Sequence, residues 1–407
     1  MKITFLCGTF EPGRDGVGDY VAMFARSLAR QGHLCQVIAL ADRFAAVATN
    51  GRDAAADCEV VRLPACGWPH GNTRAAETAL GRFAPDCVSL QMVCYAYEPR
   101  GLLLHSARSL LRLRGGGKCH LMFHELWIGE AAGSGLKERI VGALQKRLLL
   151  RTTRLWAPAV INTSNPVYRE LLRRNGVAAQ ELPLPGTIPI VPESHSNARQ
   201  WLLARLGTAG VGNNAMLAGV FGAIHPGWQA ANWLELLRRG CVHGGRGLVL
   251  IQLGRAGERG LQIWRELQSQ FGTGIAFVEL GPLPAEDISR ALQGLDLGIA
   301  TSPGQLAGKS STIAAMLEHG TPVAVTSRDY RLRAGATPEP TPHALLHPLD
   351  DGFVTRLLAG QIPRAAPQPR SDIYLTFLKS LQEAEDAENS TRSAAPPGAA
   401  GAKVTIL

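Results

Sequence analysis

Short apolar runs recur along the first half of the chain, and helix-like periodic segments separate them. Each run has the length of a strand, and each intervening segment places apolar residues at helical spacing. Strands that alternate with helices in this way form parallel sheets with helices on both faces. The pattern therefore predicts a doubly wound α/β domain whose strands are Lys2–Cys7, Cys35–Leu40, Cys58–Leu63, Asp86–Val93, Lys118–His124, Ala159–Thr163 and Gln180–Leu184.

A second series of strand-like runs begins after a polar, glycine-bearing stretch at Gly207–Asn214. It predicts a second Rossmann-like domain, so that residues 1–191 and 192–370 form two successive domains. Ligands bind such sheets outside the carboxyl ends of the strands, and we expect one interdomain cleft there. The strands of the second series are Met216–Phe221, Gly247–Leu253, Ile275–Leu280, Leu295–Thr301 and Thr321–Val325.

The end of the chain divides into a predicted helix and a predicted tail. Residues 371–386 carry five apolar residues at helical spacing and are expected to form a packed helix. Residues 387–407 are small, polar and proline-bearing, which predicts a disordered tail.

Charge favours an anionic partner without identifying it. The formal net charge is +9 and the isoelectric point is about 9.4, which suits a nucleotide diphosphate, an anionic lipid or a nucleic acid. Aromatic residues make up only 6%, too few for the stacking surface that single-stranded nucleic acid needs. Residues 137–154 hold six basic residues among leucines, which fits either a solvated helix face or a helix on anionic lipid.

The N-terminus is a predicted strand rather than a signal peptide, because glycine and proline soon interrupt its apolar run. No apolar run approaches the length that spans a membrane. We therefore expect a cytoplasmic protein, and leave open peripheral contact with the inner face of the membrane.

The loop after the first predicted strand is rich in glycine and precedes a predicted helix at Tyr20–Arg30. Gly16, Val17 and Gly18 are candidate anion-binding positions, because backbone N–H groups at a helix N-terminus attract phosphate. A simple tight turn is the alternative. The spacing is not Gly-x-Gly-x-x-Gly and no acidic residue clearly ends the second strand, which disfavours NAD.

Two titratable residues, His124 and Glu125, follow the strand Lys118–Phe123. They stand at a carboxyl end, where this fold places ligands. His124 is a candidate for hydrogen bonding a sugar hydroxyl or stabilising developing charge. A structural histidine that caps the next loop is the alternative.

The most informative segment runs from Ser302 to Thr326 and contains a lysine and three hydroxyl residues at the start of a predicted helix, Ile313–His319. Free N–H groups, the helix dipole and a lysine charge together favour a diphosphate. Ordinary N-capping is the alternative, but it accounts for only one hydroxyl. The spacing is not that of a Walker motif. The candidate site comprises Gly308, Lys309, Ser310, Ser311 and Thr312.

These segments resemble GT-B glycosyltransferases, and most closely the retaining, glycogen-synthase-like branch (family 4 type, group 1). The resemblance covers nearly the whole chain and implies that the helix 371–386 packs back on the N-terminal domain. It rests on Asp15–Tyr20, Phe123–Trp127 (FHELW), Val160–Leu171, Val220–Trp228, Gly281–Ser302 and the AAMLEHGTPVAVT segment.

The chain departs from that branch at two places. Alignment back from Gly320 puts Ala307 and Ala315 where the branch has the Glu-x7-Glu motif. After the first strand of the second domain, His225 stands where the branch commonly has an arginine and a lysine. We infer that Lys309 and the neighbouring hydroxyls take over phosphate binding, with further donor contacts at Gly222, His225, Gly254 and Arg255.

The resemblance implies a glycosyltransferase of the hexosyltransferase type that binds a UDP- or GDP-sugar as substrate, with no further cofactor. The acceptor is a glycan, a lipid-linked sugar or a small molecule, and Tyr95, Tyr97 and Arg100 are either acceptor contacts or loop packing. The sequence contains no clustered set of Asp and His residues, so it predicts no metal site. Two alternatives stay open: a nucleotide-sugar epimerase or hydrolase on the same fold, and a catalytically silent binding subunit.

Overall fold

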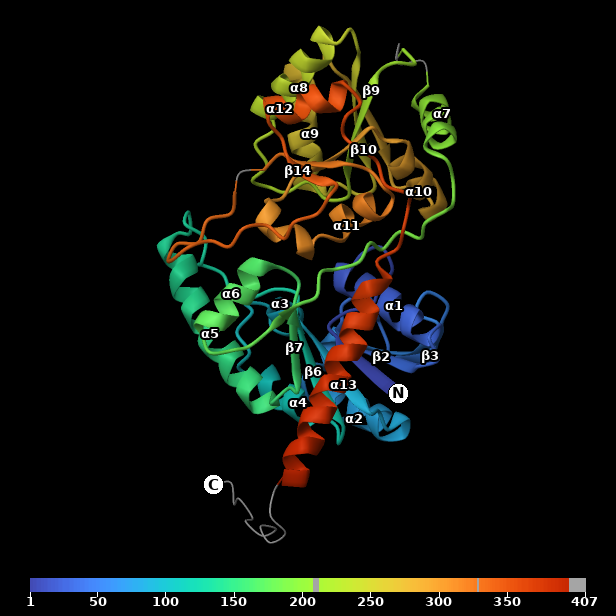
Figure 1. Cartoon of the computed structure of the whole chain (residues 1–407). Helices are drawn as coiled ribbons and strands as arrows, with labels where there is room; N and C mark the ends of the chain where they lie inside the picture. The colour runs from blue at the N-terminus through green and yellow to red at the C-terminus, as the bar shows by residue number, and fades with distance from the viewer. Residues whose placement is uncertain (208–211, 328, 395–407) are drawn as a thin grey trace.

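The computed structural model describes residues 1–207, 212–327 and 329–394. The chain forms two α/β lobes, one above the other in Figure 1, each built on its own sheet. Among the described strands every pairing is parallel except that of β3 with β4. The expected fold, with two Rossmann-like domains, is confirmed.

The N-terminal sheet has eight strands in the order β3-β4-β2-β1-β5-β6-β7-β8. Its central strands are buried on both faces, and separate apolar clusters fill the two sides. This is why they read as continuous apolar runs in the sequence. The strands are β1 (Lys2–Cys7), β2 (Leu34–Asp42), β3 (Thr49–Asp53), β4 (Cys58–Pro64), β5 (Cys87–Met92), β6 (Lys118–Phe123), β7 (Val160–Thr163) and β8 (Gln180–Glu181).

Two helices of this domain, α1 and α6, begin at side-chain caps. Asp15 accepts a hydrogen bond from the backbone N–H of Gly18 at the start of α1, and Asn165 caps α6 with Pro166 at the first helical position. The helices are α1 (Gly16–Ala29), η1 (Ala65–Gly67), α2 (His70–Phe83), α3 (Cys94–Tyr97), α4 (Ser106–Arg112), α5 (Leu136–Trp156) and α6 (Pro166–Arg174).

The C-terminal sheet has six strands in the order β11-β10-β9-β12-β13-β14. Its strands are β9 (Met216–Phe221), β10 (Leu248–Leu253), β11 (Ala276–Gly281), β12 (Leu297–Ala300), β13 (Val323–Val325) and β14 (Leu346–Pro348). Its helices are α7 (His195–Leu206), α8 (Ala231–His243), α9 (Glu258–Phe271), α10 (Ala285–Gly294), η2 (Gly304–Lys309), α11 (Ser311–Glu318) and α12 (Asp351–Leu358).

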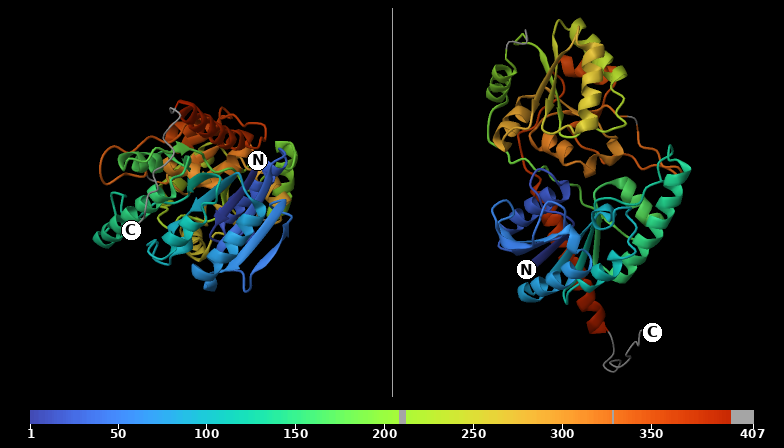
Figure 2. Two further views of the ribbon diagram at one scale, coloured as in Figure 1. Left: turned by 90° about the horizontal axis from the view of Figure 1, so that it is seen from below. Right: turned by 180° about the vertical axis from the view of Figure 1, so that it is seen from behind.

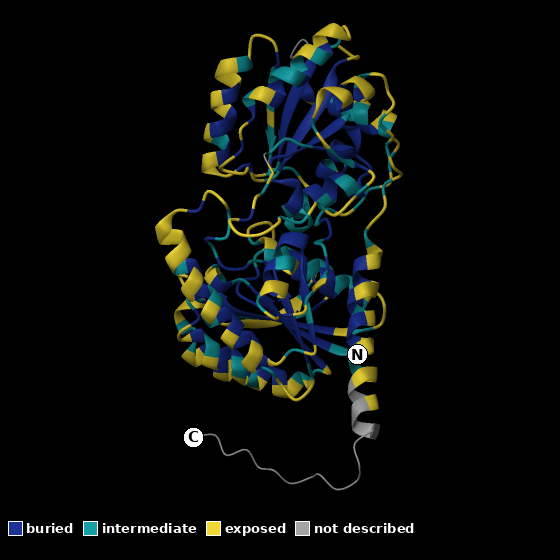
Figure 3. Cartoon of the chain, turned by 60° about the vertical axis from the view of Figure 1, so that its left-hand side comes forward, coloured by how far each residue is buried: buried dark blue, intermediate teal, exposed yellow. Residues whose placement is uncertain are grey.

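The last helix, α13 (Ser371–Ala394), leaves the C-terminal domain and lies along the N-terminal one (Figures 1 and 3). Ile373, Tyr374, Phe377 and Leu381 are buried in the apolar cluster that includes strand β1. The prediction of a tail from residue 387 was wrong for residues 387–394, which continue the helix, and residues 395–407 lie outside the described residues.

Two strands escaped the sequence pattern, and both lie at sheet edges. β3 has the sequence TNGRD and is largely exposed, so it carries no apolar run. β14 is only three residues long. Conversely, β8 ends at Glu181 rather than Leu184, since Pro183 has no N–H to donate to a ladder. Among the described helices, none has the length and apolar character that crossing a membrane requires.

Candidate functional site

A cavity of about 940 Å³ lies between the two domains, where the carboxyl ends of both sheets meet. Loops that follow β1, β9, β10 and β11 form its wall together with the linker between the domains. This is the position at which doubly wound sheets bind ligands. Of the residues predicted to bind the donor, those that line it are Gly16, Gly18, Gly222, Gly254, Arg255, Ser311 and Thr312.

The N-terminus of α1 already holds a carboxylate. The Oδ2 atom of Asp15 accepts hydrogen bonds from the Thr9 hydroxyl at 2.5 Å and from the Gly18 backbone N–H at 3.1 Å. Asp19, in the first turn of α1, accepts a hydrogen bond from the Gly13 backbone N–H, and burial raises the pKa of its carboxyl. Val17 instead packs against the apolar cluster. Two carboxylates at this helix end disfavour a further anion.

The N-terminus of α11 is free of acidic side chains. The Ser310 hydroxyl accepts from the Ile313 backbone N–H at 3.2 Å and lies 3.0 Å from the Thr312 hydroxyl. In an α-helix the first N–H groups have no intrahelical acceptor, so those of Ser311 and Thr312 are available to a ligand in the cavity. The end of the cavity that offers free backbone N–H groups without nearby carboxylates is therefore at α11.

Gly222 makes this arrangement sterically feasible. Its φ is +76°, and a Cβ there would lie 2.6 Å from the Cγ2 atom of Thr312. A residue with a side chain would have to displace the first turn of α11. Gly308 has a different role, because a Cβ at that position would collide with the backbone carbonyl of Ser164 in the N-terminal domain.

Lys309 points away from the cavity wall and toward the N-terminal domain. Its Nζ donates to the Tyr168 hydroxyl at 3.2 Å and lies 4.0 Å from the Glu125 carboxylate. Burial alone would lower the pKa of Lys309, but Tyr168 and Glu125 outweigh it and the net direction is upward. The ammonium is therefore charged. The pKa of His225 is lowered mainly by burial of its own ring and secondly by the charge of Lys309. The backbone N–H of His225 donates a hydrogen bond to the Thr301 hydroxyl.

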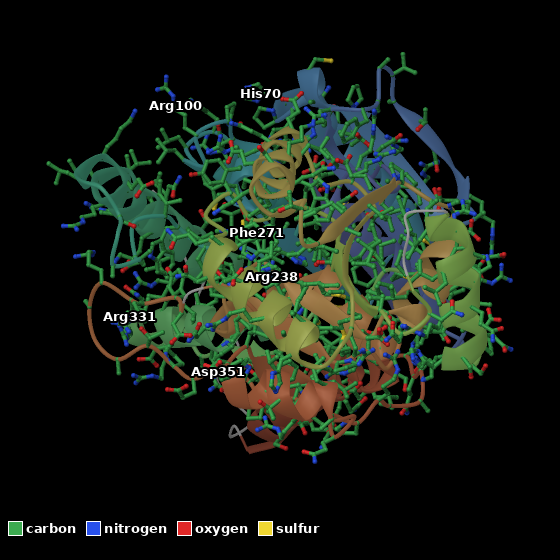
Figure 4. All side chains as sticks on the ribbon, turned by 90° about the horizontal axis from the view of Figure 1, so that it is seen from above. His70, Arg100, Arg238, Phe271, Arg331 and Asp351 are labelled. Carbon is green, nitrogen blue, oxygen red and sulfur yellow. The ribbon has the colours of Figure 1, made fainter. Side chains whose placement is uncertain are left out.

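Arg255 reaches across the cavity from the C-terminal domain. Its side chain is exposed, and Nη1 donates to the Gly13 carbonyl of the N-terminal domain at 3.3 Å. A second connection between the domains lies at a loop of the C-terminal domain, where Ala132 donates its backbone N–H to the Arg331 carbonyl (Figures 2 and 4). The contact of Arg255 with Gly13 thus borders the cavity, whereas that of Ala132 with Arg331 ties the two domains together outside its wall.

His124 is buried, with 5% of its surface exposed, and it does not belong to the cavity wall. Its ring meets the edge of Tyr20, and Nε2 lies 2.8 Å from Oε1 of Gln91. Burial, and then the nearby His120, lowers the pKa of His124 to about 3, so the imidazole is neutral. Glu125, by contrast, is half-exposed and turns toward Lys309.

A chain of hydrogen bonds fixes the tautomer of His124. An amide oxygen can only accept a hydrogen bond, so Nε2 of His124 carries the proton and donates it in a hydrogen bond to Gln91. Gln91 donates to the Ser89 hydroxyl, which lies 2.7 Å from Nδ1 of His120, and His120 in turn contacts Asn162 through Nε2. Nδ1 of His124 is left as a buried acceptor with no partner among the described residues.

Sequence reasoning missed several residues of the cavity. Arg14, Asp15 and Asp19 stand within the glycine-rich loop, and Pro282 and Leu283 follow β11. Their position after strands was the available signal. The linker residues Thr187, Ile188 and Pro189 also line the cavity, and no local pattern marks them.

The residues predicted as acceptor contacts lie elsewhere. The Tyr97 hydroxyl is buried and donates to the Gln91 carbonyl, and the Tyr95 hydroxyl accepts from Gln145 of α5. Neither these two nor Arg100 belongs to the cavity wall as the described residues form it.

Comparison with known proteins shows a likeness between the N-terminal domain and a family of glycosyltransferases. Residues 14–183 match the model of Glycosyltransferase Family 4. The match spans most of the N-terminal domain and less than half of the chain. No curated protein matches the chain.

Solved structures extend the likeness to both domains and show that the chain has the GT-B fold. Sucrose-phosphate synthase from Thermosynechococcus elongatus is 13% identical with a TM-score of 0.54, covering 97% of this chain and 100% of that one. The catalytic domain of starch synthase IV from Arabidopsis thaliana, bound to ADP and acarbose, is 14% identical with a TM-score of 0.52, covering 96% and 99%. HepE from Anabaena, in complex with UDP-glucose, is 14% identical with a TM-score of 0.52, covering 96% and 100%.

Proposed function

We propose that the protein transfers a hexose from a nucleotide-diphosphate sugar, bound in the interdomain cavity, to an acceptor on the N-terminal domain. The observation that carries this proposal is the N-terminus of α11, whose Ser311 and Thr312 line the cavity at the carboxyl edge of the C-terminal sheet. The family 4 match and the UDP-glucose held by HepE support a sugar nucleotide as the ligand. A UDP- or GDP-sugar is the proposed donor.

The chemistry follows from where charge grows during transfer. As the bond between the sugar and the diphosphate breaks, negative charge increases on the departing phosphate. Preorganised N–H groups, hydroxyls and the helix dipole of α11 stabilise that charge, and Arg255 adds a positive charge at the same cavity. His124 and Glu125 are the proposed catalytic residues. Nδ1 of His124 has no partner among the described residues, and its contact with a sugar hydroxyl requires the sugar to reach past the cavity wall, to which His124 does not belong.

A catalytically silent binding subunit is the second candidate, and two observations favour it. Ala307 and Ala315 occupy the places of the two glutamates, and Lys309 is engaged by Tyr168 and Glu125. Such a subunit would bind a sugar nucleotide without turning it over.

Calorimetry with UDP, GDP, ADP and their sugars separates these possibilities when combined with a turnover assay. We expect one diphosphate to bind well and the double variant Ser311→Ala, Thr312→Val to lose affinity by roughly 10-fold or more, since each lost hydrogen bond to a charged group costs about 1.5–3 kcal/mol. Ser302→Ala is the matched control, because that hydroxyl is outside the cavity wall. Binding of no nucleotide would refute the proposal, whereas binding without turnover on any acceptor would favour the silent subunit.

A further inference from the structure

Helix α5 forms an outer edge of the N-terminal domain, and much of its outer side is exposed (Figures 1 and 3). Three apolar residues stand at one end of that exposed side. Leu136, Ile140 and Leu144 are 73%, 63% and 45% exposed. They recur every fourth residue, so they line one face of the helix. The helix packs on the domain with its other face, through residues such as Leu149 and Trp156, which are fully buried.

The same face continues as a row of arginines. Arg147, Arg151 and Arg154 are exposed, and within the part of the chain that the structure describes they form no ion pair. The one acidic residue of the helix, Glu138, accepts a hydrogen bond from the Gly135 backbone N–H at the start of the helix. The face therefore carries a local excess of positive charge beside its apolar end.

We propose that this face docks on an anionic membrane surface. The interface of a bilayer offers acyl chains and anionic headgroups at neighbouring depths, which matches an apolar patch that adjoins a cationic one. We call this surface the α5 face, defined by Leu136, Ile140, Leu144, Arg147, Arg151 and Arg154.

The neighbouring loop strengthens the match. Leu104 is 58% exposed, and Arg100 points outward from the molecule in Figure 4. The loop is held beside α5, because the Gln145 side chain donates to the Arg100 carbonyl at 2.9 Å. It thus adds a further exposed apolar side chain and a further cation beside α5.

Charge also distinguishes a membrane from other occupants. A symmetric pairing of two copies would bring two α5 faces of the same sign together, which charge repulsion disfavours. A nucleic acid would satisfy the arginines but offer little to Leu136, Ile140 and Leu144. An anionic bilayer satisfies both halves of the face.

Co-sedimentation of the full chain with vesicles tests the proposal. One set of vesicles contains equal parts of phosphatidylglycerol and phosphatidylcholine, and the other contains phosphatidylcholine alone. We expect sedimentation with the anionic vesicles only, and a steep decrease as salt is added, because screening weakens the attraction.

Two variants separate the contribution of the arginines to vesicle binding from that of the apolar residues. The triple variant Arg147→Gln, Arg151→Gln, Arg154→Gln is expected to weaken vesicle binding by on the order of 100-fold and to lose salt sensitivity. The double variant Leu136→Ser, Ile140→Ser should bind more weakly yet keep its salt sensitivity. The matched control is Arg239→Gln, Arg259→Gln, Arg265→Gln, three exposed arginines on the C-terminal domain, which should bind as the unaltered chain does.

Thermal unfolding of each variant establishes that it is folded, and all five positions changed on the α5 face are exposed. Three results would overturn the proposal: no binding to anionic vesicles, equal binding to neutral vesicles, or equal losses in the α5 and control triple variants. In the first case an acidic protein would be the better occupant of this face.

Discussion

Lys309 of the C-terminal domain donates a hydrogen bond to the Tyr168 hydroxyl of the N-terminal domain over 3.2 Å. The same ammonium also lies over the Tyr168 ring and faces Glu125. The lysine therefore joins the two domains in this structure, beside rather than inside the cavity. A role in binding diphosphate requires it to exchange those contacts for phosphate oxygens.

We predict that Lys309→Ala weakens binding of the nucleotide diphosphate by about 1.5–3 kcal/mol, because a charge-assisted contact is lost. Binding of the nucleoside without phosphates should change little. Calorimetry with both ligands on one preparation measures the difference. Tyr168→Phe is the control, since it removes the lysine's present partner but keeps its charge, and should leave diphosphate affinity equal or higher. Equal losses for both ligands would make Lys309 a structural residue.

Gly222→Ala is predicted to impair nucleotide binding by pushing Thr312 out of position. The new Cβ would lie 2.6 Å from the Thr312 methyl group. A positive φ also strains alanine, typically by about 1–3 kcal/mol. Gly360→Ala is a matched control for that strain, because Gly360 has a φ of +69° and no atom within 4 Å of the added Cβ. Thermal unfolding and calorimetry on both variants separate strain from displacement.

The double variant Gly222→Ala, Thr312→Ser tests the cause directly. Serine keeps the hydroxyl and removes the methyl group that the new Cβ would meet. We expect nucleotide affinity to recover while the cost in stability persists. No recovery would show that the contact between Gly222 and Thr312 does not position α11.

The contrast between Ser311 and Lys309 shows how far the sequence predicts the site. Both stand at the start of one helix, and the strand and helix pattern correctly places that helix at the interdomain edge. The direction of the Lys309 side chain depends on Tyr168 and Glu125, which are distant in sequence and come close only when the domains pack. The local sequence determines where a residue lies along a strand or helix. The partner of a long side chain depends instead on the tertiary structure.

The same distinction explains His124 and the linker. The carboxyl end of β6 is predictable from its apolar run, but the inward rotation of the imidazole is set by Gln91 on the neighbouring strand. Thr187, Ile188 and Pro189 reach the cavity because the chain crosses between domains there, and no periodic pattern encodes that path. Apolar periodicity thus predicts the sheets, while side-chain orientation requires the packed structure.

Glu318 is predicted to make stability depend on pH. Burial raises the pKa of Glu318 from 4.5 to about 7, although its carboxylate accepts from the Gly186 backbone N–H at 2.8 Å. Between these two pKa values the folded chain holds a proton on Glu318 that the unfolded chain releases. The contribution of Glu318 to the free energy of unfolding therefore falls as pH rises from about 4.5 to about 7. Glu318→Gln removes the titration while keeping an acceptor for Gly186.

Chemical denaturation across that pH range checks the prediction. The stability of Glu318→Gln relative to the unaltered chain should increase with pH by about 1.4 kcal/mol for each unit of pKa difference, and level off above pH 7. Glu286→Gln, at an exposed position of α10, is the control and should leave the pH profile unchanged. A constant difference at every pH would mean that Glu318 does not titrate in this range.

The hydrogen bond between His124 and Gln91 leads to a prediction about turnover. If Nδ1 of His124 accepts from the transferred sugar and that contact strengthens as charge develops, His124→Ala should lower kcat by roughly 100-fold while nucleotide affinity changes little. Gln91→Leu should lower kcat less, because it keeps the imidazole ring and only allows His124 to populate both neutral tautomers. Since the pKa of His124 is about 3, its ionisation should leave no limb in the pH–rate profile between about pH 5 and 8.

Initial rates, calorimetric nucleotide affinity and the nitrogen NMR signals of His124 decide between catalysis and structure. In the unaltered chain the NMR signals should report a proton on Nε2 alone, and in Gln91→Leu a mixture of both tautomers, with kcat falling in step. A structural histidine predicts another pattern, in which the melting temperature drops and the loss of rate equals the loss of folded protein. An unchanged rate per folded molecule of His124→Ala would remove His124 from the catalytic residues and leave Glu125 as the remaining candidate at this strand end.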